Sequence, residues 1–485
     1  MSDEIKNEIA TEQDETATAD ETLEKEGILS DQEEKKAQKK GKKAKKQLTP
    51  EQKKKRTAKA LIITGSIVLA IVIFFSGCAI ATAVGTKGLI QQATSYSKVE
   101  YTAHTQLAPQ KPEDSGNGYW TFTKEEDGRE FKILQFTDVH IGGGSFTHQK
   151  DAWAMNAVAT MIRQEQPDLV VVTGDIAYPV PVQSGTFNNL NATKIFSNMM
   201  ETLGVYWTFA FGNHDTELYS LYSRDEICDY YENAGFKYCL FRRGFCDKKD
   251  YIGNDARGFG NDMIVVKNSD GSINQTVVTF DSHSYTDGDY FGMAWKYDNI
   301  HQCQIDWYAT EIERLSKDHN NNNTVNNIAF FHIPLEEYRN AWANVIDSGE
   351  TMTKGKIVET ERGKTEFIYG KMGETDKKKN GVRTYGVFCG SRPDELFETG
   401  LTHGMQGVFC GHDHYNNFSV NYTPAGADRS IRLTYGMSVD YLAYPGIFKK
   451  HSQRGCTRIE LKKDNTFDCV PLNYYEDFNV AHERD

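Results

Sequence analysis

Short apolar runs alternate with amphipathic stretches in this chain from about residue 129 onward. Ile133–Phe136 and Leu169–Val172 have the length and composition of buried strands. Between them, apolar residues recur at helical spacing from Thr147 to Gln166, where Pro167 ends the pattern. A helix over Ala192–Leu203 and a strand over Val205–Phe211 follow. Further strands are predicted at 277–280, 328–331 and 408–410, so the pattern predicts an α/β fold.

The first 86 residues follow a different pattern. Residues 1–34 are acidic and poor in aromatics, and residues 35–59 carry thirteen Lys or Arg against one acid, Glu51. This composition predicts a disordered tail over residues 1–59. Residues 60–86 contain no charge, and Leu61–Val84 is apolar on every face. The segment is long enough to cross a bilayer, so we expect a transmembrane signal-anchor helix there.

The charges beside this segment predict its orientation. The lysine-rich run lies directly before it, and Lys87 stands almost alone after it. By the positive-inside bias, we expect a cytoplasmic N-terminus and an extracytoplasmic catalytic domain. A cleaved signal peptide is less favoured, because nearly sixty residues precede the apolar run. Residues 87–128 are expected to form a polar stalk, and residues 129–485 the catalytic domain.

Polar clusters follow the apolar runs at the points where strands are predicted to end. They read Asp138-Val-His140, Gly174-Asp175, Gly212-Asn213-His214-Asp215, Asp281-Ser-His283, His332-Ile-Pro334 and Gly411-His412-Asp413-His414. Such strand ends are where α/β sheets place ligands. Carboxylates, imidazoles and one amide suit a pair of divalent metals that activate water for phosphate ester cleavage. A single histidine in this position is more often a buried structural residue, but the ordered set argues against that interpretation.

The ordered motifs resemble the calcineurin-like metallophosphoesterase superfamily, and the Gly-His-Asp-His motif is the most specific of them. The segments Phe330–Tyr338, Tyr435–Met437 and Arg454–Arg458 are similar to an atypical, purple-acid-phosphatase-like branch. The resemblance implies a two-sheet β-sandwich flanked by helices (αββα), with two metals at one edge. Together with the apolar segment, it predicts this fold preceded by one transmembrane helix.

The resemblance also implies roles for individual residues. Asp138, His140 and His414 are expected to hold one metal, and Asn213, His332 and His412 the other, with Asp175 bridging both. A hydroxide between the metals would attack phosphorus, His214 would assist the leaving oxygen, and Asp215 would orient the His214 imidazole. The expected cofactors are two divalent ions, Mn, Fe or Zn, since ligand type does not choose among them.

Tyr178 raises an alternative for the first metal. It stands three residues after Asp175, where purple acid phosphatases carry a tyrosine bound to ferric iron. Those enzymes lack a histidine at the position of His140, and both side chains cannot easily fill one coordination position. We favour His140 as the ligand and place Tyr178 in the pocket wall.

Two classes of function follow for such a chain. The first is a membrane-anchored phosphoesterase acting on a phosphate ester, and the alternative is a weak or inactive protein that kept the fold as a binding module. Asp281 and His283 have no ligand role in the family pattern, so a supporting contact and a purely structural role stay equally open. Residues 129–485 show no basic stripe, and we expect no nucleic acid partner. Cys228, Cys239 and Cys246 are the better disulfide candidates among nine cysteines.

Overall fold

The computed structural model describes residues 48–101, 112–114, 118–124, 129–244, 258–319, 323–379, 381–444 and 454–482. The chain divides into two compact units, Met1–Phe75 and Ser76–Asp485. Most of the tail expected at residues 1–59 lies outside the described residues, and its last ten residues begin helix α2. Both large sheets and all helices after α2 lie in the second unit.

Helix α2 (Pro50–Ala93) contains the apolar segment and is long and apolar enough to cross a membrane. It continues beyond residue 86, where a polar stalk was expected. Its last turns belong to the second unit, in which Leu89 and Ala93 are buried in the core. The segment after the helix also contacts the domain, because the Val99 amide donates a hydrogen bond to the carbonyl of Leu203. Residues 87–101 thus pack on the folded domain instead of forming a polar stalk. They do so because apolar side chains at helical spacing, such as Leu89 and Ala93, contact the surface of the domain.

One sheet carries the first half of the domain. Its central strands β3, β4 and β5 are parallel, and helices α3 and α5 connect them. These elements match the strands and helices predicted from hydrophobic periodicity. The sheet order is β17 (Phe467–Asn473), β16 (Gly455–Leu461), β3 (Phe131–Phe136), β4 (Leu169–Thr173) and β5 (Tyr206–Ala210), with α3 at His148–Glu165 and α5 at Asn189–Leu203.

A ten-stranded sheet carries most of the second half. Its centre, β7, β8 and β13, is parallel, as expected for strands that end in ligands. The order is β1 (Glu113–Asp114), β2 (Trp120–Thr123), β6 (Asp262–Lys267), β7 (Ile273–Thr279), β8 (Asn327–Phe330), β13 (Met405–Cys410), β15 (Ile431–Tyr435), β14 (Ser419–Pro424), β10 (Gly363–Tyr369) and β9 (Ile357–Thr360). The remaining elements are α4 (Pro181–Ser184), α6 (Arg224–Asn233), α7 (Gln302–His319), α8 (Glu336–Ser348), α9 (Leu396–Thr402) and the pair β11 (Lys378–Lys379) and β12 (Val382–Arg383).

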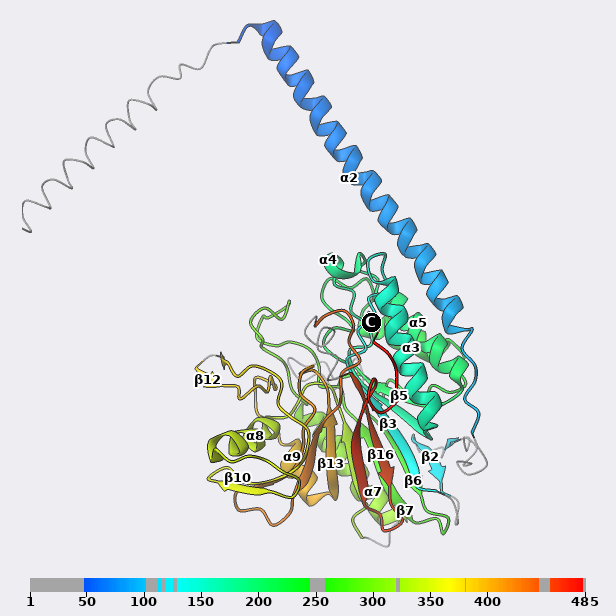
Figure 1. Cartoon of the computed structure of the whole chain (residues 1–485), viewed down its shortest axis with the longest axis vertical. Coiled ribbons are helices and arrows are strands. Elements are labelled where there is room, and N and C mark those ends of the chain that lie inside the picture. Colours follow the sequence, from blue (N-terminus) through cyan, green and yellow to red (C-terminus); the bar gives the residue numbers. More distant parts are fainter. Residues whose placement is uncertain are drawn as a thin grey trace, which may run out of the picture. The chain divides into compact units, whose positions relative to one another are not determined.

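The two sheets pack face to face with helices outside (Figure 1). Alternation along β8 shows the layers, because side chains of a strand point to opposite faces in turn. Ile328 and Phe330 join the core shared with β3, β4 and β5, while Ala329 joins the core under α7, α8 and α9. In β13, Phe409 faces the first core and Val408 the second. The predicted two-sheet sandwich flanked by helices is confirmed.

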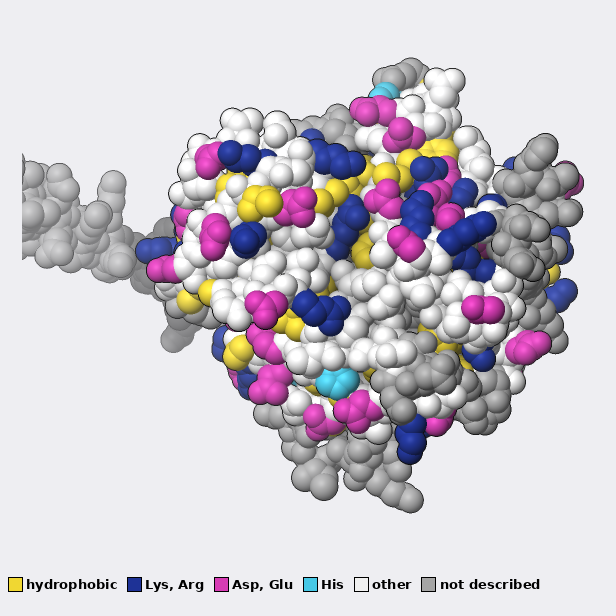
Figure 2. Space-filling model, turned by 90° about the horizontal axis from the view of Figure 1, so that it is seen from below, with side chains coloured by type: hydrophobic (Ala, Val, Ile, Leu, Met, Phe, Trp, Pro, Cys, Tyr) yellow, Lys and Arg dark blue, Asp and Glu magenta, His cyan; other side chains and the backbone are white. Residues whose placement is uncertain are grey.

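The described surface and cysteines bear on two other expectations. On the face shown in Figure 2, basic and acidic side chains are interspersed among uncharged ones. Cys228 and Cys239 are free thiols, and Cys246 lies outside the described residues. No disulfide therefore joins two of the described cysteines.

Candidate metal centre

The ligand candidates stand in the loops that follow parallel strands. Asp138 and His140 follow β3, Asp175 follows β4 and Asn213 follows β5, while His332 follows β8 of the second sheet. His412 and His414 follow β13, which pairs with β8 in parallel. Because the carboxyl ends of parallel strands meet at one edge, both sheets direct these residues to the same place.

The backbone at this edge is unusual for side chains of this size. Asp138, His140, Asp175 and His412 have φ values of 51°, 53°, 55° and 75°. This left-handed region is uncommon outside glycine, and holding a residue there costs about 1–3 kcal/mol. The surrounding structure must therefore impose the conformation, which turns each side chain inward directly at the end of its strand.

Motif glycines allow the loops to approach closely. A Cβ atom at Gly212 would lie 2.1 Å from Oδ1 of Asp175, and one at Gly411 would lie 1.8 Å from Oγ1 of Thr137. Neither distance is possible for a side chain. Glycine is thus required next to Asn213 so that the loops after β4 and β5 can approach, and next to His412 so that loops from the two sheets can meet.

The first group of ligand atoms surrounds Asp138. The side-chain ligand atoms of Asp138, His140, Asp175 and His414 all lie within 4.8 Å of one another and are buried. Nε2 of His414 is 3.2 Å from Oδ1 of Asp138, and Nε2 of His140 is 3.2 Å from Oδ2 of Asp175. Two imidazoles and two carboxylates in this space form a donor set suited to a divalent cation.

A second group lies on the opposite side of Asp175. Nε2 of His332 is 3.2 Å from the same Oδ2 of Asp175 and 3.0 Å from Oδ1 of Asn213. Nδ1 of His412 lies 3.3 Å from Nε2 of His332. One carboxylate oxygen therefore contacts an imidazole from each group, as a bridging ligand would.

The hydrogen bonds behind the ligands test whether these atoms fit a metal. Nδ1 of His332 lies 2.8 Å from the carbonyl of Thr173 and must donate to it, which leaves a lone pair on Nε2 in the neutral ring. That lone pair faces acceptor atoms of Asp175 and Asn213 together with Nδ1 of His412. A cation satisfies such a set of converging acceptors, so the residues fit a metal.

Asp440 is a residue of the site that sequence reasoning missed. It is fully buried, with one carboxylate oxygen 3.4 Å from Nδ1 of His414 and the other 3.7 Å from Nδ1 of His140. The carboxylate accepts backbone N–H groups of Leu442, Ala443 and Tyr444, and its negative charge behind the two imidazoles favours protonation of their Nδ1 atoms. The only sequence signal is its place after the strand that ends at Tyr435, in Ser438-Val-Asp440.

Electrostatics keep the bridging carboxylate ionised. Burial alone would raise the pKa of Asp175, but the positive charge that His332 and His214 carry when protonated outweighs this and lowers it well below 3.8. Burial also acts on His214 by lowering its pKa, and the charge of Asp175 and the hydrogen bond to Glu217 reverse this, so that the net shift is upward from 6.5.

His214 is oriented by Glu217 rather than by Asp215. Nδ1 of His214 lies 2.6 Å from Oε1 of the buried Glu217, which also accepts a hydrogen bond from the Tyr285 hydroxyl. The Asp215 carboxylate instead accepts backbone N–H groups of Asp175, Ala177 and Gly212. The expected role of Asp215 is thus corrected: its side chain is fully engaged in holding the ligand loops.

Comparison with known proteins decides the family. The model of the calcineurin-like phosphoesterase family matches residues 131–416. The chain belongs to the calcineurin-like phosphoesterase family. It is 26% identical over 336 residues to a protein of Arabidopsis thaliana named probable inactive purple acid phosphatase 29, covering 65% of this chain and 73% of that one.

Two further relatives match over similar lengths of this chain. Probable inactive purple acid phosphatase 28 of Arabidopsis thaliana is 26% identical over 342 residues, which are 66% of this chain and 72% of the relative. Phosphatase DCR2 of Saccharomyces cerevisiae is 27% identical over 336 residues, 64% of this chain and 48% of that protein. These names place the phosphoesterase in the purple-acid-phosphatase-like branch.

Tyr178 stacks against the site without entering the ligand cluster of the phosphoesterase. Its ring lies parallel to that of His140 at 4.6 Å, and its hydroxyl donates to Oε1 of Gln183 at 2.8 Å. Burial raises its pKa, which disfavours a phenolate. The structure therefore brings the imidazole of His140 among the ligand atoms, while the Tyr178 hydroxyl is hydrogen-bonded to Gln183.

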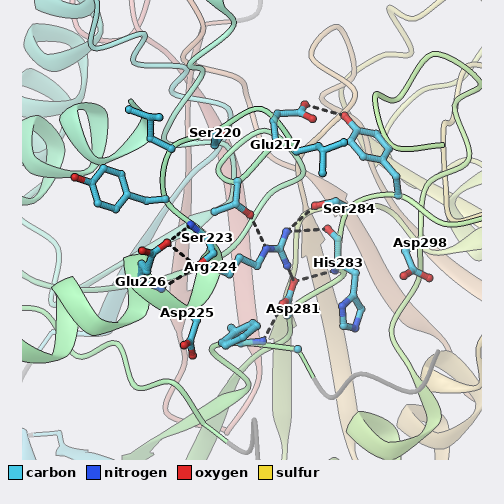
Figure 3. A pocket seen from close by; sticks show the side chains of 17 residues that line it. Glu217, Ser220, Ser223, Arg224, Asp225, Glu226, Asp281, His283, Ser284 and Asp298 are labelled. Atoms are coloured by element: carbon cyan, nitrogen blue, oxygen red, sulfur yellow. Dashed lines mark hydrogen bonds and ion pairs between the residues drawn. The ribbon is translucent and has the colours of Figure 1, made fainter. Parts of the chain in front are cut away.

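Asp281 and His283 lie outside the ligand cluster. Asp281 forms an ion pair with Arg224, which also donates to the carbonyl of His283 (Figure 3). Arg224 donates to the carbonyl of Gly212 as well. They line an open cavity of about 670 Å³ whose wall includes Glu217 and Tyr285. This cavity reaches no metal ligand, so Asp281 and Arg224 support the loop that carries His214 from behind.

A smaller cavity of about 130 Å³ opens directly on the ligand atoms. Its floor includes Asp175, His214, His412 and His414, and its walls are Trp295, Tyr297, Phe388, Tyr444, Glu374 and Lys377. The Lys377 ammonium lies 4.5 Å from the centre of the Trp295 ring. This cavity is a small, aromatic-walled approach to the ligand atoms whose wall also carries one cationic and one acidic side chain.

Replacing Asp440 with Asn should weaken metal binding by roughly 10- to 100-fold, as for other carboxylates behind ligand histidines. The amide no longer attracts the Nδ1 protons of His140 and His414. Metal titration followed by calorimetry measures the affinity, with Asp464→Asn, an exposed aspartate, as the control. Equal affinities in the two variants would show that Asp440 only packs behind the imidazoles.

Proposed function

We propose that this chain is a membrane-anchored phosphoesterase whose centre holds two divalent metal ions, Mn, Fe or Zn. One observation carries the proposal: a single oxygen of Asp175 lies 3.2 Å from Nε2 of both His140 and His332. Those imidazoles belong to two separate groups of buried ligand atoms. A carboxylate between two such groups supports a binuclear centre, with Asp138, His140 and His414 on one side and Asn213, His332 and His412 on the other.

The bound metals would supply a water activated for attack on phosphorus near neutral pH. The chain's own residues would do the rest. His214 lines the cavity over the centre and is placed to give a proton to the leaving oxygen. Glu217 holds the imidazole of His214 through Nδ1, which turns Nε2 toward the cavity. Lys377 is positioned to attract an anionic ester to the entrance.

A catalytically weak binding protein is the second candidate. The names of the two Arabidopsis relatives, which describe them as probable inactive, favour it. Against it, this chain retains the full set of seven ligands and His214. Turnover of p-nitrophenyl phosphate and of its bis-ester, measured with and without added metal, separates the two candidates. No metal-dependent hydrolysis of either ester in protein that binds metal would establish the binding module.

Replacing Asp175 with Ala removes the only ligand shared by the two groups. We expect metal content and hydrolysis to fall together, because each ion loses a ligand and their mutual repulsion is no longer offset. Elemental analysis of the purified variant gives the metal content, with Asp464→Ala as a matched aspartate control. A variant that keeps two ions per chain and a normal rate would refute the bridging role.

Replacing His214 with Ala should leave the metals bound and slow turnover by about 10²- to 10⁴-fold, the usual contribution of a general acid. Glu217→Gln should act in the same direction with a smaller loss, since the imidazole remains but is less firmly oriented. Both losses should shrink for nitrophenyl esters relative to alkyl esters, because a good leaving group needs less protonation. Equal losses of turnover for nitrophenyl and alkyl esters would exclude His214 as the proton donor to the leaving oxygen.

The anchor is the other part of the proposal. Helix α2 is apolar from Leu61 to Val84, and the thirteen basic residues of 35–59 precede this apolar stretch, which favours a cytoplasmic N-terminus and an extracytoplasmic site. Protease added to intact cells should therefore remove the part of the chain that carries His412. If this part of the chain is cleaved only after the cells are permeabilised, the orientation is the reverse, with the site in the cytoplasm.

A further inference from the structure

Exposed apolar side chains occur on each of the three loops that bring metal ligands out of the five-stranded sheet. Phe146 follows Asp138 and His140, Val182 and Phe187 follow Asp175, and Leu218 and Leu221 follow Asn213. All five are exposed, and Val182 reaches 86%. We name this group (Phe146, Val182, Phe187, Leu218 and Leu221) the apolar rim.

Contacts between the loops join the rim into one surface. The amide of Phe146 donates to the carbonyl of Ser184 in α4, beside Val182. The amide of Leu221 donates to the carbonyl of Phe187. A contiguous exposed apolar surface on a folded domain is typical of a site of interaction, whereas scattered single residues need no explanation.

The same loops lack charge. Ile176–Thr193 contains no charged residue, although a quarter of the chain is charged. Residues 218–223 contain none either and include Tyr219 and Tyr222. Charged residues flank the second stretch at Glu217 and Arg224, but the two stretches themselves are aromatic, aliphatic and uncharged polar, a composition that proteins present to the interface of a bilayer.

Helix α2 meets the domain at the edge of this surface. The amide of Ser145, next to Phe146, donates to Oγ1 of Thr82, and the Thr86 hydroxyl donates to the carbonyl of Gly143. Ile80 and Val84 on the same turns are exposed. About 20 residues of helix cross the hydrocarbon core, so a span that begins near Ala60 ends near Ile80, directly before these contacts.

We propose that the apolar rim contacts the lipid bilayer that α2 enters and so holds the metal centre at the membrane surface. The inference rests on the anchor in the proposed function. The rim is continuous, through Ser145, with the last apolar turn of that helix, which is the reason to assign lipid rather than another protein to it. A substrate for this site is then a phosphate ester presented at the bilayer surface.

Tryptophan placed on the rim tests the contact in the full chain. Val182→Trp and Phe146→Trp are made separately and reconstituted into phosphatidylcholine vesicles with or without bromine on the upper acyl carbons. The control is Ile357→Trp on the edge strand β9, which is 51% exposed and belongs to the sheet end marked by β10 in Figure 1. Emission is compared with that of the unsubstituted chain, which has six tryptophans.

We expect bromine to remove roughly half or more of the emission added at 182 and 146, since interfacial side chains reach the acyl boundary, and to leave the emission added at 357 unchanged. Equal, weak quenching at all three positions would overturn the proposal. The proposal would also be overturned if bromine did not quench the emission of the tryptophan at position 182 while the emission wavelength changed with the protein-to-lipid ratio. That result would assign the rim to contact with a second copy of the chain.

Flotation of the vesicles separates this inference from the anchor. A chain that does not float with lipid lacks the anchor, and the rim contact falls with it. A chain that floats without quenching at 182 and 146 keeps the anchor and excludes the rim contact alone. Neither result depends on turnover, so the outcome is independent of whether the centre is catalytic.

Discussion

The site depends on one buried carboxylate that two sheets surround. Asp175 follows β4 of one sheet, yet its Oδ2 contacts His332, which follows β8 of the other. Such a group is expensive to bury as an anion unless opposite charge or hydrogen-bond donors surround it. The backbone amide of His214 supplies one donor to Oδ1. Positive charge beside the carboxylate, from protonated imidazoles or from a bound cation, would offset the rest. Asp175 can therefore stay ionised only where the two sheets bring their ligand loops together around it.

The strain of the ligand loops follows from the same requirement. Four ligand-bearing residues have left-handed backbone conformations, and the Asp215 carboxylate binds three amides to hold the loops around them. A neutral residue at 215 could not accept these bonds equally well. Asp215 stabilises the site through the backbone, which is why a residue next to His214 in sequence does not contact its imidazole.

The sequence predicted the layers and the ligand candidates but not the groups behind them. Strands such as Leu169–Thr173 are short, apolar and followed by motif residues, so periodicity and spacing sufficed to place them. Glu217 and Asp440 act through side-chain direction: Glu217 reaches His214 within a loop, and Asp440 reaches two histidines from distant strands. No periodicity encodes such contacts. The continuation of α2 into the domain was not predicted for a related reason. Leu89 and Ala93 are two apolar residues in a polar stretch, and only the folded domain shows that they are buried.

One set of loops thus has two faces with opposite demands. On the side that faces the ligand cluster, these loops carry buried carboxylate, imidazole and amide side chains, several of them on residues with left-handed backbone conformations. Outward, the same loops carry Phe146, Val182 and Leu218 with hardly a charge between them. Loops with no functional contact normally expose polar residues, because nothing offsets the cost of hydrating apolar surface. Their apolar outer faces are best explained by a surface that removes them from water, and the bilayer entered by α2 is the nearest one that the chain itself specifies.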